Sequence, residues 1–237
     1  MKLYDEIIQK ILDVIPADAV AQPVSKTPSW PMAGEHMMVL RSEMAYEMGS
    51  DLKPGFGATI LTGNANLVPQ DEILVYGQDL AKITADTPYL RIALVRVRSE
   101  EMGQGNSLYA AIRKMEYVRY HFFPEGFMMR ISASKNKESV RVSQKALEEG
   151  ISFSQVGSRM IEAFHENPKV EAVKLVYVTN PDFPYQQIEE LLAESEKITG
   201  TIDHMLKDVK MDCDVCNLKP VCDEVEGLRE LHFGTNE

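Results

Sequence analysis

The architecture of this chain follows from one segment near its C-terminal end, which begins Glu171-Ala172-Val173-Lys174-Leu175-Val176-Tyr177-Val178-Thr179. Val173, Leu175 and Tyr177 alternate with a second set that is also mostly apolar, which predicts a strand covered on both faces. A turn, Asn180-Pro181-Asp182-Phe183-Pro184, separates this strand from a predicted helix that runs from about Tyr185 to Lys210.

The predicted helix carries one apolar stripe at helical spacing, made of Ile188, Leu191, Leu192, Ile198, Ile202, Met205, Leu206 and Val209. Gly200 interrupts the stripe and weakens the helix modestly. The helix leads directly to Cys213, so we expect a rigid rod to hold the loop that follows.

All three cysteines of the protein lie within ten residues, in the loop Cys213-Asp214-Val215-Cys216-Asn217-Leu218-Lys219-Pro220-Val221-Cys222. Two cysteines separated by two residues can reach one metal ion, or one cluster, from a single tight turn, and a third can close another corner. The spacing therefore predicts a metal or iron–sulfur site. A disulfide between two of the three thiols and inert reduced cysteines are the alternatives.

Zinc and a [4Fe–4S] cluster both accept three cysteines and one further ligand. Within the chain, the fourth ligand can come from His232, His204 or Asp214, and otherwise from water or a partner protein. His232 lies ten residues beyond Cys222, on a segment with a helical pattern.

The composition of the 237-residue chain is that of a globular protein, with 44% apolar and 26% charged residues. A formal charge of −11 repels a phosphate backbone, which argues against a nucleic-acid partner. No apolar run approaches the roughly 20 residues that span a bilayer. The N-terminus lacks the basic and apolar parts of a signal peptide, so we expect a cytoplasmic protein without membrane association. In that compartment close thiols stay reduced and available to metal.

The N-terminal part is predicted to hold a helix over residues 2–15, followed by a proline-rich linker over 16–34 in which Trp30 fixes the loop to the core. A strand is predicted over 36–41, with a short helix or turn before Gly49. Further strands are predicted at 58–62, 72–76 and 90–98, the last with Ile92, Leu94 and the valines set against arginines.

The loop Gly103-Gln104-Gly105 precedes a predicted helix whose apolar face includes Leu108, Ile112, Met115 and Phe122. This loop lacks the third glycine of the dinucleotide fingerprint and the Gly-Lys-Ser/Thr of a P-loop, so it is interpreted as a plain connection. Residues 127–132 predict a strand. Residues 136–149 predict a helix, or a strand and a helix, ended by Gly150.

A helix capped by Ser154 is expected to run to about Glu166. Together these elements predict an α+β fold with a mixed sheet, flanking helices and two lobes. We expect four parts: a helix and linker over 1–34, a β-rich lobe over 35–135, an αβα lobe over 136–211, and a cysteine-rich metal or cluster loop and tail over 212–237.

Several segments, in the same order, resemble the middle domain of acetyl-CoA synthase, the CO-methylating subunit of CO dehydrogenase/acetyl-CoA synthase complexes. They are Asp71–Asp79, Pro124–Phe127, Val140–Ala146 and Val156–Phe164, followed by the strand and long helix that lead to the cysteines. The resemblance covers about residues 70–232.

The resemblance implies that Cys213, Cys216 and Cys222 correspond to the first three cysteine ligands of a [4Fe–4S] cluster, with His232 in the place of the fourth. It also implies a partner protein, namely a CO dehydrogenase, a corrinoid protein or an electron carrier. Two departures limit it. The family's downstream Cys-Gly-Cys nickel site is absent from this sequence, and Met128 replaces a tryptophan proposed to lie near coenzyme A.

Three functions are consistent with these features. The first is an accessory or electron-transfer relative of acetyl-CoA synthase in one-carbon metabolism, which binds an iron–sulfur cluster or zinc. The second is an enzyme subunit that completes an acetyl- or methyl-transfer site with a partner chain. The third is a zinc-stapled interaction module without catalysis.

Overall fold

The computed structural model of the protein describes residues 2–35, 37–50, 52–102, 106–132 and 136–206. In this part of the chain the strands form two sheets. The larger sheet has the strand order β1 (Val20–Gln22), β4 (Glu72–Tyr76), β8 (Val170–Val178), β5 (Tyr89–Val97) and β3 (Gly55–Thr62). The smaller sheet has the order β2 (Met44–Met48), β7 (Glu138–Ser143) and β6 (Phe127–Ile131).

The larger sheet is mixed, because β3 pairs with β5 and β4 with β8 in parallel, while the other neighbours are antiparallel. The smaller sheet is antiparallel throughout. Helices flank the larger sheet on both faces, which confirms the predicted α+β class.

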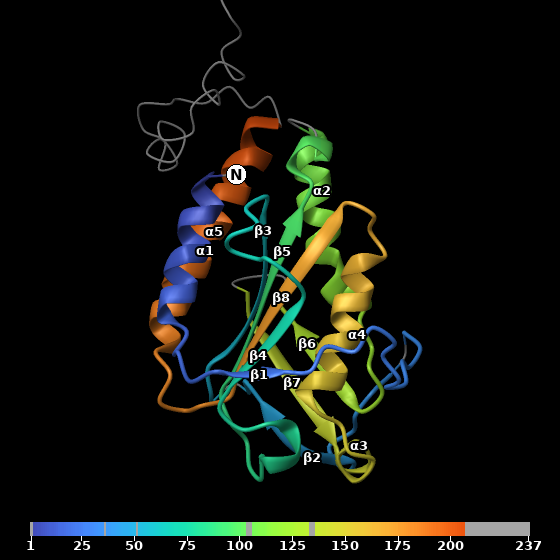
Figure 1. The fold of residues 1–237 in the computed structure, drawn as a ribbon. Helices are drawn as coiled ribbons and strands as arrows, with labels where there is room; N and C mark the ends of the chain where they lie inside the picture. Colours follow the sequence, from blue (N-terminus) through green and yellow to red (C-terminus); the bar gives the residue numbers. More distant parts are fainter. Residues whose placement is uncertain (1, 36, 51, 103–105, 133–135, 207–237) are drawn as a thin grey trace, which may run out of the picture.

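Two apolar cores lie on opposite faces of the larger sheet. On one face α1 (Lys2–Val14) and α5 (Tyr185–Leu206) lie side by side, and their buried residues meet even-numbered residues of β5 and β8 (Figure 1). On the other face α2 (Asn106–Tyr117), α4 (Phe153–His165) and the smaller sheet enclose the second core.

Strand β8 occupies the centre of the larger sheet, between β4 and β5. Val173, Leu175 and Tyr177 enter the core under α4, whereas Val176 and Val178 enter the core under α1 and α5. The two-sided burial predicted from its alternation is therefore confirmed.

The predicted linker over residues 16–34 contains a short strand. Val20–Gln22 forms β1, which pairs antiparallel with β4 at the edge of the larger sheet. Trp30 is buried, and its Nε1 donates a hydrogen bond to the carbonyl of Glu125 at 3.0 Å. The expectation that Trp30 fixes this segment to the core is confirmed.

The strand predicted over residues 36–41 is wrong. Residues 37–40 have no regular structure, a turn follows at 41–43, and the strand is instead β2, Met44–Met48. The predicted helix or turn before Gly49 is the turn at residues 41–43, and β2 lies between this turn and Gly49. The methionines of this segment fit several periods, and pairing with β7, which buries Tyr46 and Met48, selects the strand.

Residues 136–149 adopt the strand-and-helix alternative, as β7 followed by α3 (Gln144–Glu148), and Gly150 then has a left-handed φ of 88°. The predicted cap of the next helix is wrong by two residues. Ser152 caps α4 and accepts a hydrogen bond from the amide of Gln155, whereas the Ser154 hydroxyl donates to the carbonyl of Pro23.

The remaining elements confirm their predictions within a few residues. Short 3-10 turns, η1 (Leu80–Lys82), η2 (Ser99–Glu101) and η3 (Val118–His121), complete the connections, and the buried Phe122 follows η3 rather than lying on α2. No helix among the described residues has the length and apolar character that a membrane span requires. The four-part division of the chain stays a prediction.

Candidate functional site

The predicted cluster ligands Cys213, Cys216, Cys222 and His232 lie outside the described residues, as does Asp214. Helix α5 is described to Leu206, and His204 lies in its last turn. The described residues contain no group of three His, Cys, Asp or Glu side chains that could hold a metal ion. The assignment of these four ligands therefore stays a prediction.

A fully buried ion pair joins the two sheets. Arg91 of β5 donates from Nε and Nη2 to the two carboxylate oxygens of Glu138 on β7, at 2.7 and 2.6 Å. Gly57 of β3 makes room for this pair, because a Cβ at Gly57 would lie 1.9 Å from Glu138 Oε2. The pair fixes the position of β7 against β3 and β5.

Arg91 keeps its charge in this buried pair. Burial alone would lower the pKa of Arg91, but the Glu138 carboxylate outweighs burial and holds that pKa above its ordinary value. The hydroxyls of Tyr89 and Tyr177 lie in the same buried region, and burial raises the pKa of both. At neutral pH Arg91 is therefore charged and the two tyrosines are neutral.

A groove of about 1020 Å³ opens beside Glu138, and we call it the basic groove. Its lining includes Arg41, Lys53, Lys137, Arg130 and Arg141 together with the acids Glu47, Asp86, Glu138 and Glu189. Glu47 is engaged by two of these arginines, with Arg130 Nη1 at 2.7 Å and Arg141 Nε at 3.6 Å. Within the described residues, Arg41, Lys53 and Lys137 have no ion-pair partner. The groove thus sets five cationic side chains against four acids in a chain of formal charge −11.

Met128 lies close to this groove. It stands opposite Arg141 in the register of β6 and β7, and Arg130 follows it by two residues on the same face. The Met128 sulfur accepts a hydrogen bond from the amide of Val39 at 3.1 Å. The position at which the resemblance places a tryptophan is thus occupied by a thioether packed on the 37–40 segment.

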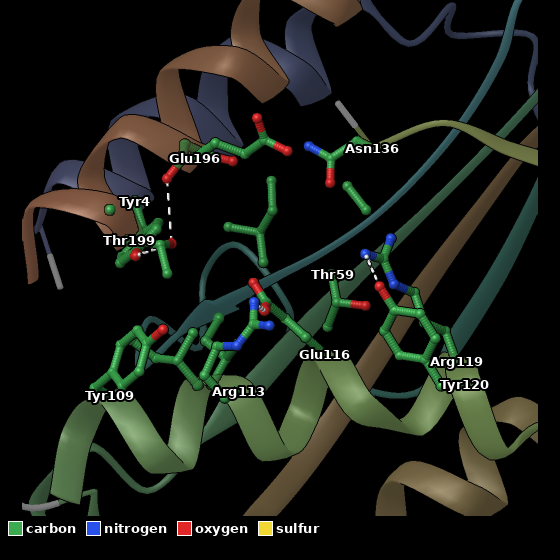
Figure 2. Close-up of a pocket in the computed structure, with 16 residues that line it drawn as sticks. Tyr4, Thr59, Tyr109, Arg113, Glu116, Arg119, Tyr120, Asn136, Glu196 and Thr199 are labelled. Carbon is green, nitrogen blue, oxygen red and sulfur yellow. Dashed lines mark hydrogen bonds and ion pairs between the residues drawn. The ribbon is translucent and has the colours of Figure 1, made fainter. Parts of the chain in front are cut away.

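A second pocket, of about 380 Å³, lies between α2 and α5 beside the edge strand β3, and we call it the α2–α5 pocket (Figure 2). Ionic and aromatic side chains dominate its lining, namely Tyr4, Tyr109, Arg113, Glu116, Arg119, Tyr120 and Glu196. At its α1 side the hydroxyls of Tyr4 and Thr199 share a hydrogen bond of 2.8 Å, and burial raises the pKa of Tyr4 to about 12.

Two carboxyl groups face this pocket under different constraints. Glu116 has a side chain 19% exposed and an ion pair with Arg113 at 2.5 Å, yet burial raises its pKa despite Arg113 and Arg119. Glu196 stands at the rim on α5, and partial burial raises its pKa while Arg119 lowers it. The pocket therefore holds two carboxylates that are poorly solvated when charged.

The sequence did not indicate the buried Arg91–Glu138 ion pair, the basic groove or the α2–α5 pocket. Arg91 was grouped with the arginines set against the apolar residues of its strand, but it is completely buried. The available signal was an arginine inside the run Tyr89-Leu90-Arg91-Ile92-Ala93, which a buried strand tolerates only when the charge is paired. The groove and the pocket have no local signal, because their residues come from several separate elements.

The fold and the cysteine loop together define an α+β module followed by a predicted metal-binding tail. The chain belongs to the CO dehydrogenase/acetyl-CoA synthase complex beta subunit family, because the model of that family matches residues 24–183. No match was found among curated proteins. The matched residues run from the segment before Trp30 to the turn before α5 and include the four segments that carry the resemblance, but they end before the cysteine loop.

Proposed function

We propose that this chain is an accessory component of a CO dehydrogenase/acetyl-CoA synthase system, and that it binds a [4Fe–4S] cluster, or else zinc, through its cysteine loop. The observation that carries the proposal is the combination of family membership over residues 24–183 with three cysteines confined to residues 213–222. Family members are subunits of a complex, which supports a protein partner for this chain as well.

The donor set fits such a centre. Three thiolates within ten residues match the cysteine ligation of cubane clusters, and an imidazole is an accepted ligand of both zinc and iron–sulfur centres. Cys213, Cys216, Cys222 and His232 would hold the group. When bound, an iron–sulfur cluster supplies a one-electron centre whose potential depends on hydrogen bonds and exposure around the sulfurs.

Metal analysis of the full chain, purified without oxygen, tests the proposal. We expect about four irons and four sulfides per chain and broad visible absorbance, as a cubane requires. Replacement of Cys213, Cys216 or Cys222 by serine is expected to abolish the cluster, whereas His165→Ala, which changes a histidine paired with Asp71, leaves it intact. Colourless protein with one zinc would defeat the electron-transfer role, and protein without either metal would defeat the proposal.

The fourth ligand has its own test. His232→Ala is expected to lower cluster content or to shift its spectrum, while His204→Ala is expected to change neither. The opposite result would assign the fourth ligand to His204. An unchanged spectrum in both variants would assign it to a group outside these two histidines.

The electron-transfer partner is proposed to be a CO dehydrogenase, a corrinoid protein or an electron carrier. A reduced partner would give one electron to the oxidised cluster and would itself be oxidised by one electron. Mixing the anaerobic chain with each partner class in its reduced form, and following the visible bleaching of the cluster, identifies the donor. Bleaching by none of them would leave only a structural role for the metal.

A second candidate, favoured by the basic groove, is a subunit that completes an acetyl-transfer site with a partner chain. Arg41, Lys53 and Lys137 have no ion-pair partner among the described residues and would suit an anionic acyl carrier such as coenzyme A. Titration with coenzyme A tests this candidate. Binding that weakens in Lys53→Gln and Lys137→Gln, together with nickel retention on co-purification with a partner, would support it, and absence of binding would exclude it.

A further inference from the structure

The floor of the α2–α5 pocket is an open sheet edge. Strand β3 is the last strand of the larger sheet, and on its outer side Gly57 makes two hydrogen bonds. The Gly57 amide donates to the carbonyl of Asn136, and the Gly57 carbonyl accepts from Arg119 Nη1 at 2.7 Å. Backbone directions alternate along a strand, so the amide and carbonyl of Thr59 point to the same side. Within the described residues, these two groups of Thr59 have no backbone partner on that side.

The end of the pocket near Gly57 is rich in hydrogen-bond donors. Arg119 is held there by the carbonyl of Gly57 and by the hydroxyl of Tyr120, over whose ring its guanidinium lies at 5.0 Å. Arg119 Nε and Thr59 Oγ1 are buried and have no hydrogen-bond partner among the described residues. This end therefore offers a fixed positive charge with unused donors, which is the environment that a carboxylate requires.

The neighbouring part of the pocket is rich in acceptors. Glu116 reaches into it from α2, forms an ion pair with Arg113 on the same helix and is also attracted by Arg119. Glu196 reaches in from α5, has no hydrogen bond or ion pair with any described residue, and points toward Asn136 across the opening (Figure 2). Only the longer-range attraction of Arg119 thus acts on the Glu196 carboxylate, next to a site for an anion.

The α5 side of the pocket is open at the exposed Gly200. Gly200 lines the pocket on α5, and a Cβ at that position would meet no atom within 4 Å. Packing inside the protein therefore does not require glycine here, although glycine in a helix costs stability relative to alanine.

We propose that the α2–α5 pocket binds a small zwitterion, a molecule that carries a carboxylate and an ammonium group a few carbons apart. The carboxylate lies at Arg119 and the backbone edge of Thr59, and the ammonium group lies between Glu196 and Glu116. This site shares no lining residue with the basic groove, and it does not depend on the function proposed above.

Three probes with the same four-carbon skeleton separate the two charges: 4-aminobutyrate, butyrate and n-butylamine. Calorimetric titration of each into the full chain, at pH 7, measures affinity. We expect 4-aminobutyrate to bind at least about tenfold more tightly than either singly charged probe, because each charged end adds a charge-assisted hydrogen bond. Equal affinity of all three probes, or no binding of 4-aminobutyrate at millimolar concentration, would overturn the proposal.

Two variants test whether the ligand binds in the α2–α5 pocket. Glu196→Gln is expected to reduce the affinity for 4-aminobutyrate about tenfold while leaving that for butyrate unchanged. Gly200→Leu is expected to abolish binding of every probe without loss of helix or of thermal stability, since the added side chain enters open space. Glu190→Gln, on the exposed side of the same helix, is the matched control and should bind as the unaltered chain does. Unchanged binding in Gly200→Leu would show that the probes bind elsewhere.

Discussion

At the scale of single residues, the Arg91–Glu138 pair shows how one buried charge determines its surroundings. Both side chains are 0% exposed, so neither retains water as a partner. Desolvation of two charges is compensated only when the geometry is bidentate, as it is here. The absent side chain of Gly57 is part of the same arrangement, because any Cβ there would collide with the carboxylate.

Glu138→Gln is therefore expected to destabilise the protein by about 3–5 kcal/mol, because it leaves Arg91 buried and charged without a counter-ion. Urea unfolding measures the change. The double variant Arg91→Met with Glu138→Leu is expected to lose less than Glu138→Gln alone. Glu171→Gln, which removes an exposed partner of Arg96 and Arg98, is the control and should cost less than about 1 kcal/mol.

The pKa of Glu116 gives a prediction about pH. Because burial raises this pKa above its ordinary value of 4.5, folding favours the protonated form, and the stability that Glu116 contributes is lost as pH rises through the raised pKa. Glu116→Gln cannot ionise. We expect the melting temperature of this variant, relative to that of the unaltered chain, to rise as pH increases from 4.5. A relative melting temperature of the variant that falls with pH would contradict the assignment.

At the scale of elements, two helical glycines have opposite structural meanings. Gly157 on α4 faces β4 so closely that a Cβ would lie 2.8 Å from Cδ1 of the buried Ile73. Gly200 on α5 faces open space. The close approach of α4 to the sheet therefore depends on glycine, whereas the path of α5 does not.

Alanine at these two positions is expected to change stability in opposite directions. Gly200→Ala should stabilise by about 1 kcal/mol through helix propensity. Gly157→Ala gains the same propensity, but overpacking against Ile73 typically costs about 1–3 kcal/mol, so we expect a net loss. Urea midpoints of both variants, measured side by side, check the pair. Stabilisation by both would show that α4 shifts freely on the sheet, and destabilisation by both would contradict the open surroundings of Gly200.

At the scale of the whole molecule, the described body has two cores, one on each face of the larger sheet. Helix α5 is anchored to this body by Ile188, Leu192 and Ile198, before the chain reaches the cysteine loop. The described body thus has its own cores, and we expect the proposed metal of the tail to serve a function rather than the stability of the fold.

A chain shortened to end before Asp212 is therefore expected to lose all bound metal and to keep its melting temperature within a few degrees. Calorimetry of the shortened and full chains, each with and without metal, makes the comparison. Unfolding of the shortened chain, or a large loss of stability when the full chain is stripped of metal, would instead assign the metal a structural role, because such binding is coupled to folding.

Local patterns in the sequence were sufficient for the fold class, for most helices and strands, and for the two-sided burial of β8, since the alternation of apolar side chains reports which faces are covered. They were also sufficient to recognise the family, because the four similar segments follow one another in the same order as in that family. The strand predicted over residues 36–41 is wrong, because methionine fits helix and strand alike and only pairing with β7 places the strand at Met44–Met48.

The tertiary structure alone decided which charges meet. Arg91 and Glu138 are 47 residues apart, and the α2–α5 pocket combines side chains from α1, β3, α2 and α5. No pattern within one element specifies such contacts, because electrostatic energy depends on distance and solvent exposure in the folded chain. Composition and spacing could predict a metal-binding tail from three clustered thiols, but only packing could create a buried ion pair and a pocket lined by opposed charges.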